Sequence, residues 1–148
     1  WVLRHRSNCV YTRSMHSKKS PSPVALSVAA AEEALRHVDP DQPSAGLPHL
    51  REAQDHLTRA IDEAMAAAVL SEGSTIRTAG VLAGLSENAV GPRLARTTSL
   101  SAYAAPDGGR VTASGVERAR YDLEEGRHRL AEPDAEPRPM RFRARRNT

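Results

Sequence analysis

The stretch STIRTAGVLAGLSENAVGPRLAR, residues 74–96, carries the strongest structural signal in this chain. Ser74 is a favoured helix N-cap, because its hydroxyl oxygen can accept a hydrogen bond from the free amides of a first turn. Gly84 can adopt the positive φ that a tight turn between helices requires, and Ser86 is placed to cap the helix that follows. The pattern predicts a helix to about Ala83, a short turn and a second helix, which together form a helix-turn-helix.

The second helix of this motif, expected over residues 87–96, would turn Val90 and Leu94 inward at a spacing of four residues. Pro92 lies inside that span, where proline removes one helical hydrogen bond and clashes with the preceding turn, at a cost of about 3 kcal/mol. Two outcomes stay open: the helix kinks at Gly91-Pro92, or it restarts there with Pro92 in its first turn. On the preceding helix, small side chains would let the two helices cross closely; they are Ala79, Gly80 and Ala83.

Two further helices are predicted before the motif. Residues 23–38 repeat apolar side chains at spacings of three and four, and the repeat stops at Asp39-Pro40. Residues 47–70 form the longer helix, with Pro48 in its first turn and Gly73 supplying the left-handed residue past its end. Its apolar stripe consists of Leu50, Ala53, Leu57, Ile61, Ala64 and Ala68. We expect an antiparallel hairpin with this stripe in the core, which is compatible with a dimer-forming coil.

A wing and a last helix are predicted after the motif. Residues 98–105 alternate apolar and polar side chains, which is typical of a half-buried strand. Residues 106–109, Pro-Asp-Gly-Gly, are a turn signal, because proline fixes φ and glycine accepts positive φ. With a short return strand they predict a β-hairpin wing over residues 98–112. The sequence Ser-Gly-Val-Glu at 114–117 matches a capping box and predicts a helix over residues 114–131.

The chain resembles the small helix-turn-helix regulators common in actinobacteria through Ile61-Asp62-Glu63-Ala64-Met65, Gly73, Ile76-Arg77, Ala83-Gly84-Leu85-Ser86 and Ala89-Val90. The resemblance covers about residues 61–94 and is weaker to residue 121, and Gly80 stands where the family usually has alanine. It implies DNA binding and transcription regulation. The expected fold class is mainly α: a helical hairpin leading into a trihelical helix-turn-helix, with a short β-hairpin wing and a C-terminal helix, within residues 24–131.

Contacts to DNA can be assigned by residue type. The positions expected to be exposed on the second helix of the motif are Glu87, Asn88, Gly91 and Arg93. Glutamate can accept from cytosine, asparagine can bond adenine in bidentate fashion, and arginine can do the same with guanine. Thr75, Arg77 and Arg96 are better placed for phosphates, and Arg110 would lie at the tip of the wing. The full set of expected DNA-binding residues is Thr75, Arg77, Ser86, Glu87, Asn88, Arg93, Arg96 and Arg110.

Charge is distributed unevenly within a formal net charge of +3. Residues 1–23 carry five basic side chains and no acidic one, whereas residues 24–72 carry three arginines against nine acidic side chains. Residues 73–120, which hold the motif, carry six arginines against three acidic side chains. This basic excess around the motif and at the ends suits a phosphate-binding surface. We expect the segments 1–23 and 132–148 to be disordered, and Met15 is a candidate start.

Patterns for catalysis or metal binding are missing: the sequence has no HExxH, nucleophile elbow, Walker loop or dinucleotide fingerprint. We therefore expect no enzyme, no metal and no cofactor. The lone Cys9 favours a reducing cytoplasm, and no apolar run is long enough to span a membrane. The expected partners are double-stranded DNA and a second copy of the chain. A second function class stays open, a non-catalytic protein-interaction module, antitoxin- or adaptor-like, in which the acidic hairpin 24–72 binds a basic partner.

Overall fold

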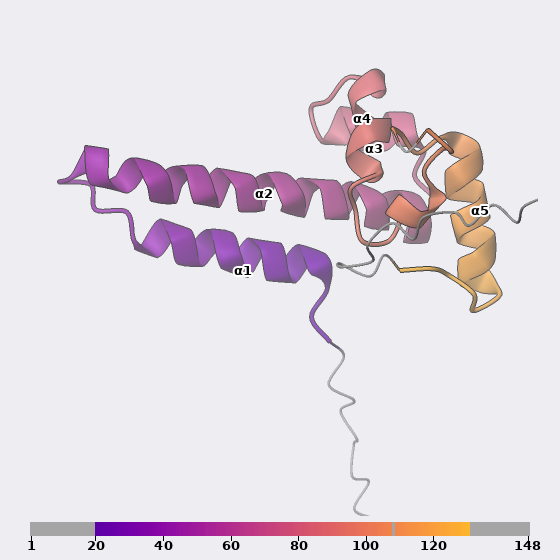
Figure 1. Cartoon of the computed structure of the whole chain (residues 1–148), viewed down its shortest axis with the longest axis horizontal. Helices are drawn as coiled ribbons and strands as arrows, with labels where there is room; N and C mark the ends of the chain where they lie inside the picture. The colour runs from indigo at the N-terminus through magenta and orange to yellow at the C-terminus, as the bar shows by residue number, and fades with distance from the viewer. Residues whose placement is uncertain (1–19, 108, 131–148) are drawn as a thin grey trace, which may run out of the picture.

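A computed structural model describes residues 20–107 and 109–130 of the chain, and these residues are mainly helical. Figure 1 shows a long hairpin of two helices, of which the second runs into a cluster formed by the later elements. The elements are α1 (Pro23–Arg36), α2 (Pro43–Ser71), α3 (Ile76–Leu82), α4 (Glu87–Leu94), the 3-10 turn η1 (Ser101–Tyr103) and α5 (Ala113–Glu124). The segments predicted to be disordered lie outside the described residues, apart from residues 20–23, of which Pro23 is the first residue of α1.

The hairpin of α1 and α2 packs through small side chains. Ala31 and Ala34 of α1 are buried, and so are three residues of α2 that recur every seven positions, Gly46, Ala53 and Ala60. A repeat of seven keeps these three on nearly one line along the helix, and their small size lets the two backbones approach closely. The hairpin therefore forms with little apolar bulk between its helices.

The prediction that the large residues of the α2 stripe lie in the core is wrong. Leu50, Leu57 and Ile61 are exposed, although Ala53 from the same predicted stripe is buried. The physical reason is that one neighbouring helix covers only one face of α2, and α1 packs on the small-residue face. The leucines lie on an adjacent face of α2.

The ends of α2 explain its length. It begins at Pro43, earlier than predicted, because proline in the first turn lacks only an amide that would have no helical partner. Pro48 consequently lies inside the helix instead of in its first turn. Gly73, just past the end of α2, has φ 71°, which confirms the predicted left-handed residue.

The core lies in the cluster where the C-terminal half of α2 meets the elements that follow. Its largest fully buried side chains are aliphatic, with a single buried tyrosine beside them. Every element except α1 contributes to this core, so the position of each of them depends on the others. Its members are Met65, Ala66, Val69, Ala79, Val90, Leu94, Leu100, Tyr103, Val111, Val116 and Ala119.

The predicted β-hairpin wing is wrong: in residues 98–107 and 109–112 the structure has no strand. Leu100 and Tyr103 are both buried, whereas Ala102 between them is exposed. A spacing of three brings side chains to one side of a helical turn and not of a strand, and the segment accordingly forms η1. The loop is closed by one backbone hydrogen bond, from the amide of Ala105 to the carbonyl of Arg110 at 2.8 Å.

The last helix, α5, begins earlier and ends sooner than predicted. Its N-cap is Thr112, whose hydroxyl accepts from the amide of Gly115 at 3.4 Å, so the predicted cap at Ser114 is two residues late. It ends at Glu124, and Gly126 follows with φ 66°. The helix therefore does not extend over residues 125–130 of the predicted span.

An arginine of α5 fixes that helix to the C-terminal end of α2. Arg120 donates from Nε to the carbonyl oxygen of Val69 at 2.7 Å and from a terminal nitrogen to that of Ser74 at 2.9 Å. The last carbonyls of a helix have no intrahelical donor, and this side chain supplies a donor to that of Val69. Arg120 thereby ties together α2, the start of the motif and α5.

Candidate nucleic-acid interface

Two short helices and a four-residue turn form the predicted helix-turn-helix. The N-cap of α3 is Thr75, whose hydroxyl accepts from the amide of Thr78 at 3.0 Å, one residue later than the predicted cap at Ser74. Gly84 has φ 67°, as predicted for the turn. The turn is closed by the amide of Leu85, which donates to the carbonyl of Gly80 at 2.8 Å. This bond fixes the direction in which the chain enters α4.

The crossing of α3 and α4 depends on a glycine. An ideal Cβ placed on Gly80 would lie 2.7 Å from Cγ2 of Val90, closer than side chains tolerate. Val90 and Leu94 are fully buried against α2 and the rest of the core. Ser86 occupies the N-cap position of α4, as predicted, but its side chain makes no capping hydrogen bond. One face of α4 is therefore held inside, and the N-terminal end of the helix faces outward.

Pro92 does not break α4, which continues from Glu87 to Leu94. The alternative in which the helix restarts at Pro92 is wrong, because α4 is continuous across the proline and only Arg93 and Leu94 follow it within the helix. Gly91 is buried, so its predicted exposure is wrong. Its carbonyl accepts from the amide of Val111 at 3.0 Å, and an ideal Cβ on Gly91 would lie 2.9 Å from the carbonyl oxygen of Val111. The glycine serves as the platform on which the 110–111 segment docks.

Arg93 points back toward α2 instead of outward. Its Nε lies 2.6 Å from Oδ1 of Asp62, and the two side chains are only 24% and 12% exposed. Burial raises the pKa of the Asp62 carboxyl above its ordinary 3.8, and the guanidinium of Arg93 opposes part of that shift. The prediction that Arg93 is exposed for reading a base is wrong in this structure, because the side chain holds α4 to α2.

A second carboxylate of α2 holds the segment that follows α4. Oε1 of Glu63 accepts from the amide of Thr98 at 2.8 Å and from its hydroxyl at 2.9 Å. The sequence reading assigned Asp62 and Glu63 only to the resemblance and missed these roles. Two adjacent acidic residues in an otherwise apolar stretch of α2 were the available signal, since buried charges in proteins are nearly always paired.

The structure brings five of the predicted DNA-binding residues to one end of the motif, among them Ser86 at the N-cap of α4. Arg77 of α3 and Glu87 of α4 are exposed, with 4.0 Å between Nε and Oε2. Asn88, the next residue, is also exposed. Arg110 lies alongside α4, because its Nε is 3.9 Å from an ideal Cβ on Gly91, one turn after Asn88. Two arginines therefore flank a glutamate and an asparagine at the outward end of α4.

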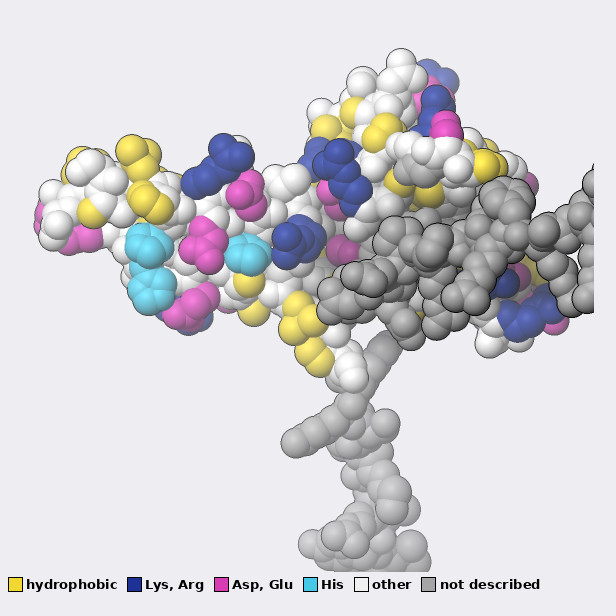
Figure 2. Space-filling view, viewed as in Figure 1, with side chains coloured by type: hydrophobic (Ala, Val, Ile, Leu, Met, Phe, Trp, Pro, Cys, Tyr) yellow, Lys and Arg dark blue, Asp and Glu magenta, His cyan; other side chains and the backbone are white. Residues whose placement is uncertain are grey.

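The remaining predicted residues are placed differently. Thr75 uses its hydroxyl in the cap of α3. Arg96 is exposed past the C-terminal end of α4, near enough to Asp62 to lower the pKa of that carboxyl. It therefore lies toward α2 and away from Asn88. Figure 2 shows that the arginine side chains of the described residues on the viewed face are scattered over several elements, without a single large basic patch.

Comparisons with protein-family models, with curated proteins and with solved structures find no match for this chain. Within the described residues, no helix is both long and apolar enough to cross a membrane. The same residues contain no cluster of three His, Cys, Asp or Glu side chains that could hold a metal ion. The functional proposal therefore rests on the geometry of the motif and the chemistry of its residues.

Proposed function

We propose that the chain binds double-stranded DNA by inserting the N-terminal end of α4 into the major groove, as a non-catalytic regulator of transcription. The observation that carries the proposal is the orientation of α4. Val90 and Leu94 hold one face of the helix in the core, while Glu87 and Asn88 project from its free end. A recognition helix packed on its partner by one face, with its first residues directed outward, is the geometry that helix-turn-helix proteins use.

The residues at that end match the chemistry of base and phosphate recognition. Asn88 can bond the N6 and N7 atoms of adenine, and Glu87 can accept from N4 of cytosine. Arg77 and Arg110, on either side, are placed for phosphate oxygens, which position the helix without reading sequence. Arg96, farther along, can add a phosphate contact at the other end of α4. This function would place the protein in the cytoplasm, with the chromosome.

The phosphate contacts are tested by the salt dependence of binding. We expect the affinity for duplex DNA to fall between about 50 mM and 200 mM salt, because bound cations are released when arginines neutralise phosphates. Arg77→Ala and Arg110→Ala should each reduce the slope of log K against log salt by about 1. Arg51→Ala, on the hairpin, is the matched control, since Arg51 is 74% exposed and Arg77 is 81% exposed. An equal effect of the control would show that the slope does not come from the motif.

The base contact is tested by selecting bound sequences from a random duplex pool with the full chain and with Asn88→Ala. The full chain should enrich a site that contains an adenine at one fixed position. Asn88→Ala should lose the preference at that position, a discrimination of about 1–3 kcal/mol, while the other positions keep theirs. Identical selected sites from both proteins would remove Asn88 from the recognition surface.

A further inference from the structure

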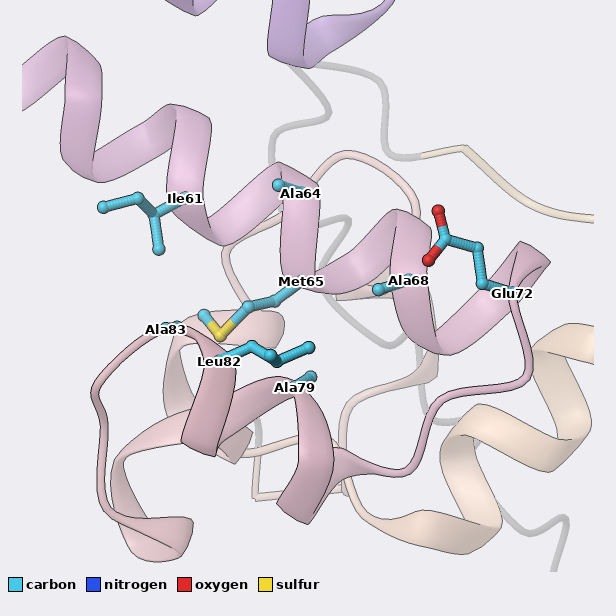
Figure 3. A pocket seen from close by; sticks show the side chains of 8 residues that line it. All are labelled: Ile61, Ala64, Met65, Ala68, Glu72, Ala79, Leu82 and Ala83. Atoms are coloured by element: carbon cyan, nitrogen blue, oxygen red, sulfur yellow. The ribbon is translucent and has the colours of Figure 1, made fainter.

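The face of α2 that α1 leaves uncovered continues into an apolar groove. Leu47, Leu50, Leu57 and Ile61 are exposed along this face. Toward the C-terminal half of α2 the face becomes a groove of about 380 Å³ between α2 and α3. Figure 3 shows Met65 reaching from α2 toward Leu82 of α3 across this groove. Its lining is apolar except at one end and consists of Ile61, Ala64, Met65, Ala68, Glu72, Ala79, Leu82 and Ala83.

The two halves of this face are complementary in shape. The N-terminal half carries three exposed leucines, Leu47, Leu50 and Leu57. In the C-terminal half, the part of α2 beside the hollow includes the small residues Ala64 and Ala68 as well as the larger Ile61 and Met65. Bulk is therefore at one end of the helix face and space is at the other, about 27 Å apart from Leu50 to Ala68 at the α-helical rise. A second copy of the same face, turned by 180°, places bulk against space at both ends.

We propose that two copies of the chain form a symmetric dimer in which their α2 helices pack antiparallel through this face. The positions on this face recur as pairs four residues apart within seven-residue repeats, namely 50 and 54, 57 and 61, and 64 and 68, and all of them except Gln54 are apolar. When two such helices pack antiparallel, the first residue of a pair in one copy contacts the second residue of a pair in the other copy. Leu57 then packs on Ile61 of the second copy, and Leu50 enters the groove over Ala68 of the second copy.

The size of the surface fits a second copy. Taken together, the exposed parts of Leu47, Leu50, Leu57, Ile61 and Leu82 amount to roughly 450 Å² in each copy, more than half of the ~800 Å² that one partner contributes to a standard interface. Leu82 is the most exposed of these, at 78%. The largest apolar patch on a soluble monomer is often a functional surface. A two-fold dimer covers this apolar face on both copies at once, so that no equivalent face stays exposed to bind a further copy.

The dimer also has a consequence for the proposed function. Two helix-turn-helix motifs related by a two-fold axis read two half-sites of opposite direction. The interface lies on α2 and the groove-facing side of α3, whereas Asn88 and Glu87 project from α4. The dimer does not depend on DNA binding, and it is tested without DNA.

The first test is the mass of the full chain in solution by sedimentation equilibrium. We expect twice the 16.0 kDa of one chain at micromolar concentration. Leu57→Glu should raise the dissociation constant at least about 100-fold, because it buries a carboxylate in the middle of an apolar contact. Leu123→Glu on α5 is the matched control, since Leu123 is 46% exposed and Leu57 is 45% exposed. Helical circular dichroism should stay unchanged in both variants, because neither residue is buried within one copy.

The second test fixes the direction of packing by disulfide cross-linking in a Cys9→Ser background, in which an introduced cysteine is the only thiol. Chains carrying Leu50→Cys and chains carrying Ala68→Cys should cross-link when they are mixed and not when either is oxidised alone. Cross-linking of Leu50→Cys with itself would show a parallel arrangement and overturn the proposal. A wild-type chain that stays monomeric, or a Leu57→Glu chain that stays dimeric, overturns it as well. A dimer without duplex affinity would instead contradict only the proposed function.

Discussion

At the scale of single residues, glycines decide how closely the parts of the motif approach. Gly80→Ala improves helix propensity by about 1 kcal/mol, but the new Cβ would lie 2.7 Å from Cγ2 of Val90. Overpacking of a buried contact costs about 1–3 kcal/mol, so we expect a net loss of stability of about 1 kcal/mol. Urea unfolding followed by circular dichroism measures it.

The cause of that loss can be isolated with Val90→Ala, which removes the atom that the new Cβ meets. In the Val90→Ala background, Gly80→Ala should be neutral or stabilising, because only the gain in helix propensity remains. Equal losses in both backgrounds would show that the α3–α4 distance is not set by this contact.

The carboxyl of Asp62 makes the stability of the folded chain depend on pH. Burial raises the pKa of its carboxyl above 3.8, against the opposing effect of Arg93. The folded state therefore holds this proton more tightly than the unfolded state, and the contribution of Asp62 to stability decreases as pH rises from 3.8 through the raised pKa. Asp62→Asn lacks this titration, so the wild type should lose stability relative to Asp62→Asn as pH rises over that range.

The measurement is the urea midpoint of both proteins from about pH 3 to pH 6. Asp55→Asn, an exposed carboxyl on the same helix, controls for the general effect of removing one negative charge. A wild type that gains stability relative to Asp62→Asn with rising pH would mean that the ion pair with Arg93 outweighs burial.

At the scale of elements, the contact between α4 and the 110–111 segment holds Arg110 beside the recognition helix. Gly91→Ala would place a Cβ 2.9 Å from the carbonyl oxygen of Val111. We expect the segment to lift from α4, with a loss of about 1–3 kcal/mol in stability and faster hydrogen exchange at the Val111 amide. Nuclear magnetic resonance measures that exchange.

Gly109→Ala is the control for this element, since its Cβ would meet only the Asp107 side chain, at 3.9 Å. It should leave exchange at Val111 nearly unchanged. Weaker duplex binding by Gly91→Ala and unchanged binding by Gly109→Ala would connect the docked segment to DNA recognition. Unchanged exchange at Val111 in Gly91→Ala would contradict the role of Gly91 as a platform.

The helices were predictable from the sequence, and so was the buried face of α4, but the face that α2 buries was not. Periodicity located the hairpin and the motif, and glycine located the turns at residues 73 and 84. Periodicity does not tell which of two adjacent apolar faces of α2 meets α1, because small and large stripes both repeat at helical spacing. Local alternation likewise predicted strands at residues 98–105, where burial of Leu100 and Tyr103 in the core favours a helical turn.

The candidate site was predictable only in part, for a similar reason. The exposure of Glu87 and Asn88 follows from the motif, because they form the first turn of its second helix, ahead of the buried Val90 and Leu94. The position of Arg93 does not follow from it. Its ion pair joins residues 31 positions apart, Asp62 and Arg93, and such pairing depends on the tertiary fold.

At the scale of the whole molecule, we propose that the hairpin serves assembly and that the motif serves DNA recognition. The long helix α2 belongs to both, since its C-terminal half lies in the core while its N-terminal half extends away from it (Figure 1). A dimer formed along α2 would therefore set the relative position of two recognition helices. The central claim beneath this arrangement is that α4 reads duplex DNA.

The most direct measurement of that claim is fluorescence anisotropy of a labelled duplex, titrated with the full chain at about 50 mM and again at about 200 mM salt. The account predicts saturable binding at the lower salt and a clear loss of affinity at the higher salt, with further loss in Arg77→Ala and not in Arg51→Ala. A folded chain that leaves the duplex unbound at about 50 mM salt would contradict it.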